Sequence, residues 1–310
     1  MNRKRKMIIR WILVLSATLF VLPGIILLLY NAYVRHTIRK EENLYNIKGN
    51  EAYFKFAERK GDGRSPAVLL IHGFGGSPYD FKPLTDELEK QGIAFHAILL
   101  PGHGTSPRNL TNVTEEEFLK YSLNALDKLK EKYGEISVVG FSMGGTLAIN
   151  LAEEREVNKL ILFGPYLDIT RKWYYLGKPE KWAKRLYPIL PYVGKIKIAN
   201  INDPAGLKRY DSYKHLPVKT VLEMEKLSHK AGENIDKIHC SILWFHSRHD
   251  IASDYNSAKS FFEKIPSRRK NFIEYTRSNH MILYDYDAQD AIRRTLAFLN
   301  RGELKDGNAE

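Results

Sequence analysis

Apolar runs of strand length alternate along the chain with segments whose apolar positions recur at helical spacing. The predicted strands are the runs AVLLIHG, IAFHAILL, ISVVGFS, KLILFGP, SILWFHS and NFIEYT. Helices are predicted over 80–91, over 114–133 and directly after Met143, and Thr114 with Glu117 matches a capping box. Strands that are apolar on both faces and alternate with helices indicate an α/β fold with a mostly parallel central sheet covered on both faces. Ligands of such sheets bind at the carboxyl ends of the strands.

The longest apolar run lies near the amino terminus. After MNRKRK, the residues from about Met7 to Tyr30 are mostly Ile, Leu, Val and aromatic residues, and the run is long enough to cross a membrane as a helix. A cleaved signal peptide would have a shorter apolar region that ends in a small-x-small site, and LLLYNAYVRHTIRK offers no clear one. We therefore expect an uncleaved single-pass anchor. Basic residues from Arg3 to Arg10 favour a cytoplasmic amino terminus, with the body of the protein on the non-cytoplasmic side.

The pattern divides the chain into four parts. Residues 1–40 form a basic segment, the anchor and the start of a polar tether; 41–167 and 236–303 form the core; 168–235 form an insertion; and 304–310 form a polar tail. The insertion is rich in Lys and Arg and carries the aromatic residues Trp173, Tyr174, Tyr175, Trp182, Tyr187 and Tyr192. Such a segment is either a solvated basic surface with ordinary packing aromatics, or a surface that meets a membrane. The sequence leaves both interpretations open.

Composition narrows the classes of partner. The formal charge of +12 suits nucleic acid or an anionic membrane, but no helix-turn-helix, RNP or zinc-finger pattern accompanies it, so no nucleic-acid partner is expected. The single cysteine, Cys240, excludes an intrachain disulfide and lies in an apolar run where a buried thiol is expected. His246 and His249 beside Asp250 lack a third ligand at suitable spacing, so we expect no metal and no cofactor.

The run VVGFSMGGTLAI carries the first candidate for chemistry. Gly140, Ser142 and Gly144 give G-x-S-x-G, which is weak evidence alone, but here it follows a predicted buried strand and opens a predicted helix. A sharp turn at that junction crowds its neighbours, which explains the small residues on either side of the serine. The turn would lift the Ser142 hydroxyl above the sheet, where the helix amino terminus favours developing negative charge.

A serine nucleophile requires a base and a group that orients the base. SILWFHSRHD ends a predicted strand near Asp250, and NFIEYTRSNH ends the next one near His280, so both reach the sheet edge where Ser142 emerges. Taken alone, Asp250 could be a turn or cap residue and His280 a satisfied polar residue; their joint placement favours catalysis. In LLIHGFGGSP, the Phe74 backbone N–H could join that of Met143 as an oxyanion donor, and the run lacks the spacing and lysine of a phosphate-binding loop.

The runs HGFGGSP, LLPGHGTSP, GFSMGG, SRHD and SNHMI, in this order and spacing, resemble the bacterial carboxylesterase and monoacylglycerol lipase family of α/β-hydrolases. The resemblance covers about Ala67 to Leu299. It implies Ser142 as the nucleophile, Asp250 and His280 as its partners, Phe74 and Met143 as oxyanion donors, and carboxylic esters as substrates. It also implies that the insertion is a cap over the active site and that His103 is structural, whereas His72 either supports the oxyanion turn by hydrogen bonding or simply packs.

Two positions depart from the family pattern. Asn279 stands where the family often has glycine, and Gly75 replaces a frequent threonine. These changes could alter the shape of the histidine loop and of the oxyanion loop without removing a catalytic group.

We therefore expect a membrane-anchored serine hydrolase that cleaves esters of medium or longer acyl chains, such as monoacylglycerols, through an acyl-enzyme. A thioesterase, lysophospholipase or acyltransferase would use the same three residues. A noncatalytic binding protein of this fold usually lacks one of them, whereas this chain keeps all three. The expected partners are the ester substrate and a lipid bilayer, contacted through the amino-terminal helix, with the cap as a second candidate contact.

Overall fold

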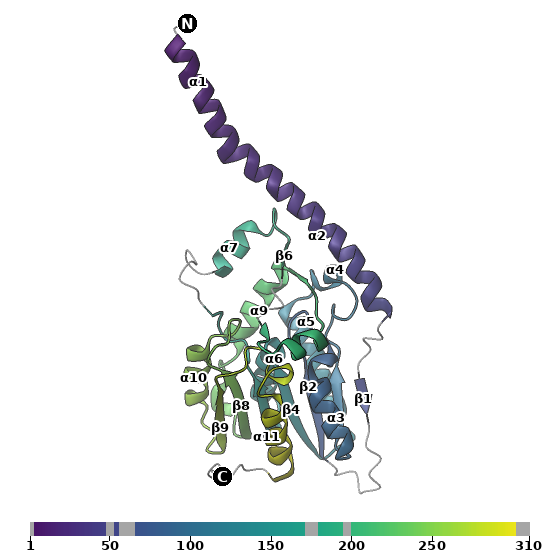
Figure 1. Ribbon diagram of the computed structural model, residues 1–310. Coiled ribbons are helices and arrows are strands. Elements are labelled where there is room, and N and C mark those ends of the chain that lie inside the picture. Colours follow the sequence, from purple (N-terminus) through teal and green to yellow (C-terminus); the bar gives the residue numbers. More distant parts are fainter. Residues whose placement is uncertain (1–2, 48–52, 56–65, 171–178, 195–199, 302–310) are drawn as a thin grey trace.

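A seven-stranded sheet forms the centre of the molecule in the computed structural model, which describes residues 3–47, 53–55, 66–170, 179–194 and 200–301 (Figure 1). Its strand order is β1-β3-β2-β4-β5-β8-β9. The strands are β1 (Tyr53–Lys55), β2 (Pro66–Ile71), β3 (Ala94–Ile98), β4 (Glu135–Phe141), β5 (Lys159–Phe163), β8 (Ser241–Ser247) and β9 (Lys270–Tyr275). Strand β1 runs antiparallel to β3 at one edge, and the other pairings are parallel. The predicted α/β fold with a mostly parallel sheet is confirmed.

Helices cover both faces of the sheet (Figure 1). One face packs against α5 (Glu115–Lys130), α6 (Met143–Glu154), α9 (Val218–Lys230) and α10 (Tyr255–Lys264), and the other against α3 (Lys82–Lys90) and α11 (Ala288–Arg301). Along β2, Leu69 and Ile71 join the first core, while Val68 and Leu70 join the second. Successive side chains of a strand point to opposite faces, so a strand buried on both sides must be apolar throughout.

The start of α5 shows how the sequence fixes a helix boundary. The Thr114 hydroxyl accepts from the Glu117 backbone N–H at 3.3 Å, and the Glu117 carboxylate accepts from the Thr114 backbone N–H at 2.9 Å. The predicted capping box is therefore confirmed. The helix expected over 80–91 begins instead as a 3-10 turn, η2 (Pro78–Phe81), before α3.

We call residues 168–235 the cap segment; it lies between β5 and β8. Besides α9 it contains α7 (Pro179–Leu186), β6 (Tyr192–Gly194), α8 (Pro204–Arg209) and β7 (His215–Pro217), and the 3-10 turn η4 (Ile235–Lys237) follows. Strands β6 and β7 pair antiparallel, apart from the central sheet. Figure 1 shows α7 and β6 beyond the carboxyl ends of the central strands. Trp173, Tyr174, Tyr175 and the side chain of Trp182 lie outside the described residues.

The amino-terminal segments α1 (Arg3–Ser16), η1 (Ala17–Val21) and α2 (Leu22–Ile47) form one long helix that extends away from the sheet past the cap segment (Figure 1). The π-helical turn η1 precedes Pro23, whose nitrogen cannot donate to the preceding turn and whose ring crowds it. Arg3–Lys40 is long and apolar enough to cross a membrane; its most apolar 18-residue window has a mean hydropathy of 2.8, and none of that window is buried.

The polar tether expected from Arg39 onward is helical as far as Ile47. Arg, Lys and Glu are good helix formers, so the helix that precedes them propagates through this polar stretch. Two short helical turns complete the fold, α4 (Pro107–Leu110) before α5 and η5 (Ile282–Tyr284) before α11.

Thr114→Ala should lower the free energy of unfolding by about 1 kcal/mol, because two backbone donors at the start of α5 lose their reciprocal cap. Urea denaturation followed by circular dichroism measures the change. Lys120→Ala, on the exposed face of the same helix, is the control and should change stability by less than about 0.5 kcal/mol. Equal effects of the two substitutions would contradict the role of the cap.

Candidate active site

Ser142 occupies the single-residue turn between β4 and α6. It has φ 52° and ψ −119°, and it is the one non-glycine residue with positive φ in the part of the chain that the structure describes. Its backbone N–H donates to the Phe163 carbonyl at 3.0 Å, and its own carbonyl accepts from the Tyr166 N–H at 3.1 Å. Such a conformation costs about 1–3 kcal/mol, and it persists because these bonds to the end of β5 hold it.

The glycines of the motif allow this turn to approach its neighbours. A Cβ on Gly140 would lie 2.3 Å from the Gly144 carbonyl oxygen, and one on Gly144 would lie 1.9 Å from the Ile71 carbonyl oxygen. Either distance is far below van der Waals contact. The G-x-S-x-G spacing is therefore a packing requirement of the strand, turn and helix at Ser142.

Three predicted side chains meet at the carboxyl edge of the sheet. The His280 Nε2 atom lies 2.9 Å from the Ser142 Oγ atom, and His280 Nδ1 lies 2.7 Å from Asp250 Oδ2. All three residues are less than a tenth exposed. The carboxylate accepts from Nδ1–H, which leaves Nε2 to accept the serine proton. The structure thus assembles a Ser–His–Asp chain in the predicted order.

Local hydrogen bonds fix the carboxylate of Asp250. Its Oδ1 atom accepts from the backbone N–H groups of Ala252 and Ser253, both at 2.8 Å. Burial by itself raises the pKa of this carboxyl, but the His280 imidazole and the hydrogen bonds outweigh burial, and the pKa lies below its usual range. Asp250 is therefore an anion at neutral pH, oriented toward His280.

A second imidazole, that of His246, lies close to the Asp250 carboxylate. It is fully buried, and its Nε2 atom lies 3.2 Å from the Ser253 carbonyl oxygen and 3.6 Å from Asp250 Oδ2. Burial lowers its pKa, so it is neutral; its Nδ1 atom accepts from the Trp244 Nε1–H at 3.5 Å, and its Nε2–H donates to the Ser253 carbonyl beside Asp250. From the sequence, this residue is considered only as a metal ligand; the signal that could have found its role is a histidine at a buried position of an apolar strand.

The glycine-rich turn after β2 packs directly against Ser142. A Cβ on Gly73 would lie 3.3 Å from the Ser142 Cβ. Gly76 N–H closes the turn on the Gly73 carbonyl at 3.1 Å, so the Phe74 N–H is not used by the turn. Met143 is the first residue of α6, so its N–H has no acceptor within the helix. The two predicted donors therefore lie just beyond the carboxyl ends of the neighbouring strands β2 and β4.

Buried side chains form hydrogen bonds to the backbone of the glycine-rich turn after β2. His103 Nε2 accepts from the Gly75 N–H at 3.0 Å, and Asp80 Oδ2 accepts from the Gly73 N–H at 3.1 Å. His72 Nε2 accepts from the Leu100 N–H at 3.0 Å. Of the two roles considered for His72, the structure shows hydrogen bonding, and it gives His103 the expected structural position. Asp80 was expected only as the start of a helix.

Gly75 is explained by its surroundings. Its φ is 68°, and a Cβ there would lie 2.5 Å from Cδ2 of Leu216 in β7. Its carbonyl accepts from the Tyr213 N–H at 2.8 Å. The cap segment of this chain therefore occupies the space that a threonine side chain would need.

Asn279 joins the two loops that carry the acid and the base. Its Oδ1 atom accepts from the His280 N–H at 2.9 Å and from the Ile251 N–H at 3.3 Å, and its Nδ2 donates to Asn202 Oδ1 at 3.3 Å. Glycine could form none of these side-chain bonds. The departure from the family pattern thus adds a link between the histidine loop and the loop after β8.

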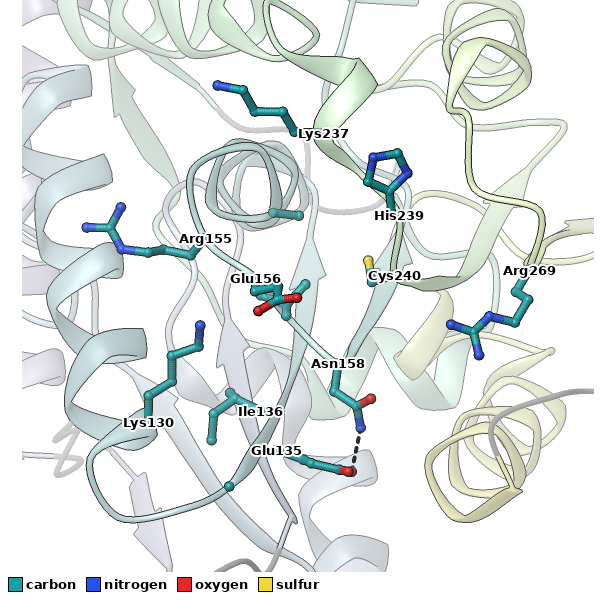
Figure 2. Close-up of a pocket in the computed structure, with 13 residues that line it drawn as sticks. Lys130, Glu135, Ile136, Arg155, Glu156, Asn158, Lys237, His239, Cys240 and Arg269 are labelled. Carbon is teal, nitrogen blue, oxygen red and sulfur yellow. Dashed lines mark hydrogen bonds between the residues drawn. The ribbon is translucent and has the colours of Figure 1, made fainter.

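A cavity of about 490 Å³ lies at the opposite edge of the sheet, around the amino ends of β4, β5 and β8 (Figure 2). Its lining mixes basic side chains, among them Lys237 and Arg269, with Glu135 and Glu156. Cys240 also lines it and is partly rather than fully buried; burial raises the pKa of its thiol to about 12. None of the predicted catalytic residues lines this cavity, so it is separate from the Ser–His–Asp chain at the carboxyl edge.

The sheet order and the Ser–His–Asp chain at the carboxyl edge define an α/β-hydrolase. Residues 63–287 match the family described as serine aminopeptidase, S33, and the chain belongs to this family. A structure from work on LipS and LipT, two metagenome-derived lipolytic enzymes, is similar with a TM-score of 0.72 at 21% identity, over 82% of this chain and 98% of the other. A monoacylglycerol lipase from Paleococcus ferrophilus is similar with a TM-score of 0.66 at 23% identity, over 80% and 98%.

Two curated relatives align with about three quarters of this chain. A thermostable monoacylglycerol lipase from Bacillus sp. (strain H-257) is 28% identical over 233 residues, 74% of this chain and 89% of the relative. A carboxylesterase from Bacillus subtilis (strain 168) is 24% identical over 242 residues, 77% and 94% of the two chains. The resemblance seen in the motifs is thus confirmed, and with it the enzyme class, the carboxylic ester hydrolases.

Gly75→Thr should lower kcat/KM on an ester at least about tenfold, because the added side chain displaces the oxyanion turn or Leu216. Gly92→Thr is a matched control: its φ is 64°, but a Cβ there meets nothing within 4 Å. Both variants should lose about 1–2 kcal/mol of stability through the left-handed backbone, and only Gly75→Thr should lose activity. Thermal unfolding and ester kinetics measure the two effects; similar activities of the variants would contradict the packing argument.

Proposed function

We propose that this protein is a membrane-anchored serine hydrolase that cleaves carboxylic esters through an acyl-enzyme, with monoacylglycerols as the substrate class. The observation that carries the proposal is the hydrogen-bonded chain from Ser142 Oγ through the His280 imidazole to the buried carboxylate of Asp250. A serine hydroxyl is a weak nucleophile, and this arrangement supplies both its base and the group that orients the base.

In the first half of the reaction, Ser142 Oγ attacks the ester carbonyl carbon while His280 Nε2 takes its proton. The Asp250 carboxylate stabilises the imidazolium that forms, and the backbone N–H groups of Phe74 and Met143 donate to the oxyanion. Collapse of the tetrahedral intermediate releases the alcohol, which takes the proton from His280. A water molecule, deprotonated by His280, then attacks the acyl-enzyme. When the second tetrahedral intermediate collapses, the bond to Ser142 Oγ breaks, Oγ takes the proton back from His280, and the acid is released.

Two observations support lipid esters as substrates. The curated relatives include a monoacylglycerol lipase and a carboxylesterase, and the amino-terminal helix has the length and apolar surface of a membrane span. Within that helix, the hydroxyls of Ser16 and Thr18 donate to the carbonyls of Ile12 and Val14, as the absence of water in a bilayer requires. The basic residues before the span favour a non-cytoplasmic catalytic domain.

Ser142→Ala should abolish labelling by a fluorophosphonate probe and lower ester turnover by at least about 10³-fold, because the nucleophile is lost while the oxyanion donors remain. Ser260→Ala, at an exposed position of α10, is the matched control and should keep both properties. Near-normal turnover in Ser142→Ala would refute the mechanism. A profile over esters of graded acyl length, run beside a thioester and a lysophospholipid, tests the substrate class.

Asp250→Asn should lower kcat by about 10⁴-fold at neutral pH, because the amide favours the wrong imidazole tautomer. The matched control is Asp254→Asn, since the Asp254 carboxylate caps α10 and accepts from the N–H and the hydroxyl of Ser257, both at 2.8 Å. That change should keep kcat within about twofold, because asparagine also caps well. A severe loss in Asp254→Asn together with a harmless Asp250→Asn would overturn the assignment of the acid.

A further inference from the structure

Between Val21 and Lys40, one face of the long amino-terminal helix is partly or fully buried, although the other side chains of this stretch are exposed. Val34 and Ile38 are 1% and 0% exposed, whereas Tyr33 on the same helix is 63% exposed. Within residues 21–40, the partly and fully buried residues follow one helical stripe: Leu27, Tyr30, Asn31, Val34, Thr37 and Ile38. This spacing places them on a single face. Side chains of an isolated helix remain exposed, so the body of the protein covers this stripe.

A hydrogen bond joins this stripe to the cap segment. The Asn31 side-chain amide donates to the Ile189 carbonyl at 2.8 Å, across 158 positions of sequence. Ile189 lies in the turn between α7 and β6. Figure 1 shows α2 passing beside that region. The end of the apolar helix is therefore docked on the cap segment rather than joined to it only through the chain.

The position of Asn31 along the helix determines where its contact with Ile189 would lie relative to a membrane. It directly follows the apolar run from Met7 to Tyr30, about 24 residues, which at about 1.5 Å per residue exceeds the roughly 30 Å of a bilayer core. The turn that holds Ile189 thus lies where the helix would leave the hydrocarbon. In this turn Tyr187 and Ile189 are 40% and 52% exposed.

The side chains around the turn suit a lipid interface. Tyrosine is enriched at the level of the headgroups, and Lys184 and Arg185, exposed at the end of α7, can meet anionic lipids. A soluble protein partner would gain nothing from a position fixed at the end of a membrane span. The observations therefore favour the bilayer itself as the occupant of this surface.

The same turn connects to the active site through short contacts. The Val218 N–H donates to the Pro191 carbonyl at 2.9 Å, and β6 pairs with β7. In β7, Leu216 fills the space above Gly75, and Tyr213 just before it donates to the Gly75 carbonyl. The pair β6 and β7 thus bridges the helix contact at Ile189 and the turn that carries the predicted oxyanion donor Phe74.

We propose that the stripe Leu27–Ile38 binds the cap segment and fixes it at the end of the membrane span. In this position Tyr187 and Ile189 contact the headgroups of an anionic bilayer, and the active-site edge of the sheet faces that bilayer. Ester substrates then reach Ser142 directly from the membrane. The inference rests on the proposed function, which supplies the membrane anchor and the ester substrate. It adds the arrangement of the helix and the cap segment relative to the bilayer.

Depth measurements on the full-length protein test the geometry. In a Cys240→Ser background, Ile189→Cys is labelled with an environment-sensitive fluorophore and placed in vesicles of phosphatidylcholine and phosphatidylglycerol that contain brominated lipid. The label should be quenched, whereas one on Arg268→Cys, exposed before β9 at the opposite sheet edge, should not. Val34→Ser with Ile38→Ser should abolish the quenching, and the matched control Tyr33→Ser should retain it. An unquenched label at position 189, or quenching that survives the double substitution, would overturn the proposal.

Activity in the same vesicles gives an independent readout. The Val34→Ser/Ile38→Ser protein should hydrolyse vesicle-borne monoacylglycerol at least about fivefold more slowly, because the active site loses its fixed approach to the lipid, and soluble p-nitrophenyl butyrate within about twofold of the normal rate. Equal losses on both substrates would overturn the proposal, since the stripe would then act as part of the core. Ester turnover that survives Ser142→Ala would refute the proposed function. The quenching of the label at position 189 would still test whether the helix binds the cap segment.

Discussion

The backbone at Ser142 constrains everything around it. Its positive φ is compatible with a non-glycine residue only because Phe163 at the end of β5 accepts from its N–H, because Tyr166 in the following loop donates to its carbonyl, and because no side chain stands at Gly140 or Gly144. With the turn held in this way, the hydroxyl has one position relative to the sheet. The oxyanion turn, the histidine loop and the loop after β8 must then meet that position, and the hydrogen bonds of His103 and Asn279 set two of those loops.

Polar groups behind the site are buried together and satisfy one another. His72 and His103 each accept a backbone N–H through Nε2, so both are neutral, with the proton on Nδ1 directed to the carbonyls of Gly73 and Pro101. The acid side of the site has the same character, since Asp250 accepts from two backbone donors and from His280. Networks of this kind are rigid because each unpaired group would cost the full desolvation penalty.

The sheet and the positions of Ser142, Asp250 and His280 could be predicted because they depend on short-range patterns: apolar runs, a glycine-flanked serine, and polar residues at strand ends. The bond from His103 to Gly75, by contrast, spans 28 positions, and that from Asn31 to Ile189 spans 158. No periodicity encodes such contacts, since they depend on how finished elements pack. The stretch after Arg39 was expected as a tether because it is polar, although its residues favour helix. The catalytic roles and the domain boundaries stay predictions.

The fit between Gly75 and Leu216 couples the sequence of the cap segment to that of the core in this chain. A loop of the core and a strand of the inserted segment share one volume, so a larger residue on one side demands a smaller one on the other. The cap segment of this chain is therefore not independent of the core: a smaller side chain at position 216 would leave a void above Gly75, and a larger residue at position 75 would displace Leu216. Changes on the two sides of this contact are coupled, and such coupled changes restrict which sequences this chain can reach one mutation at a time.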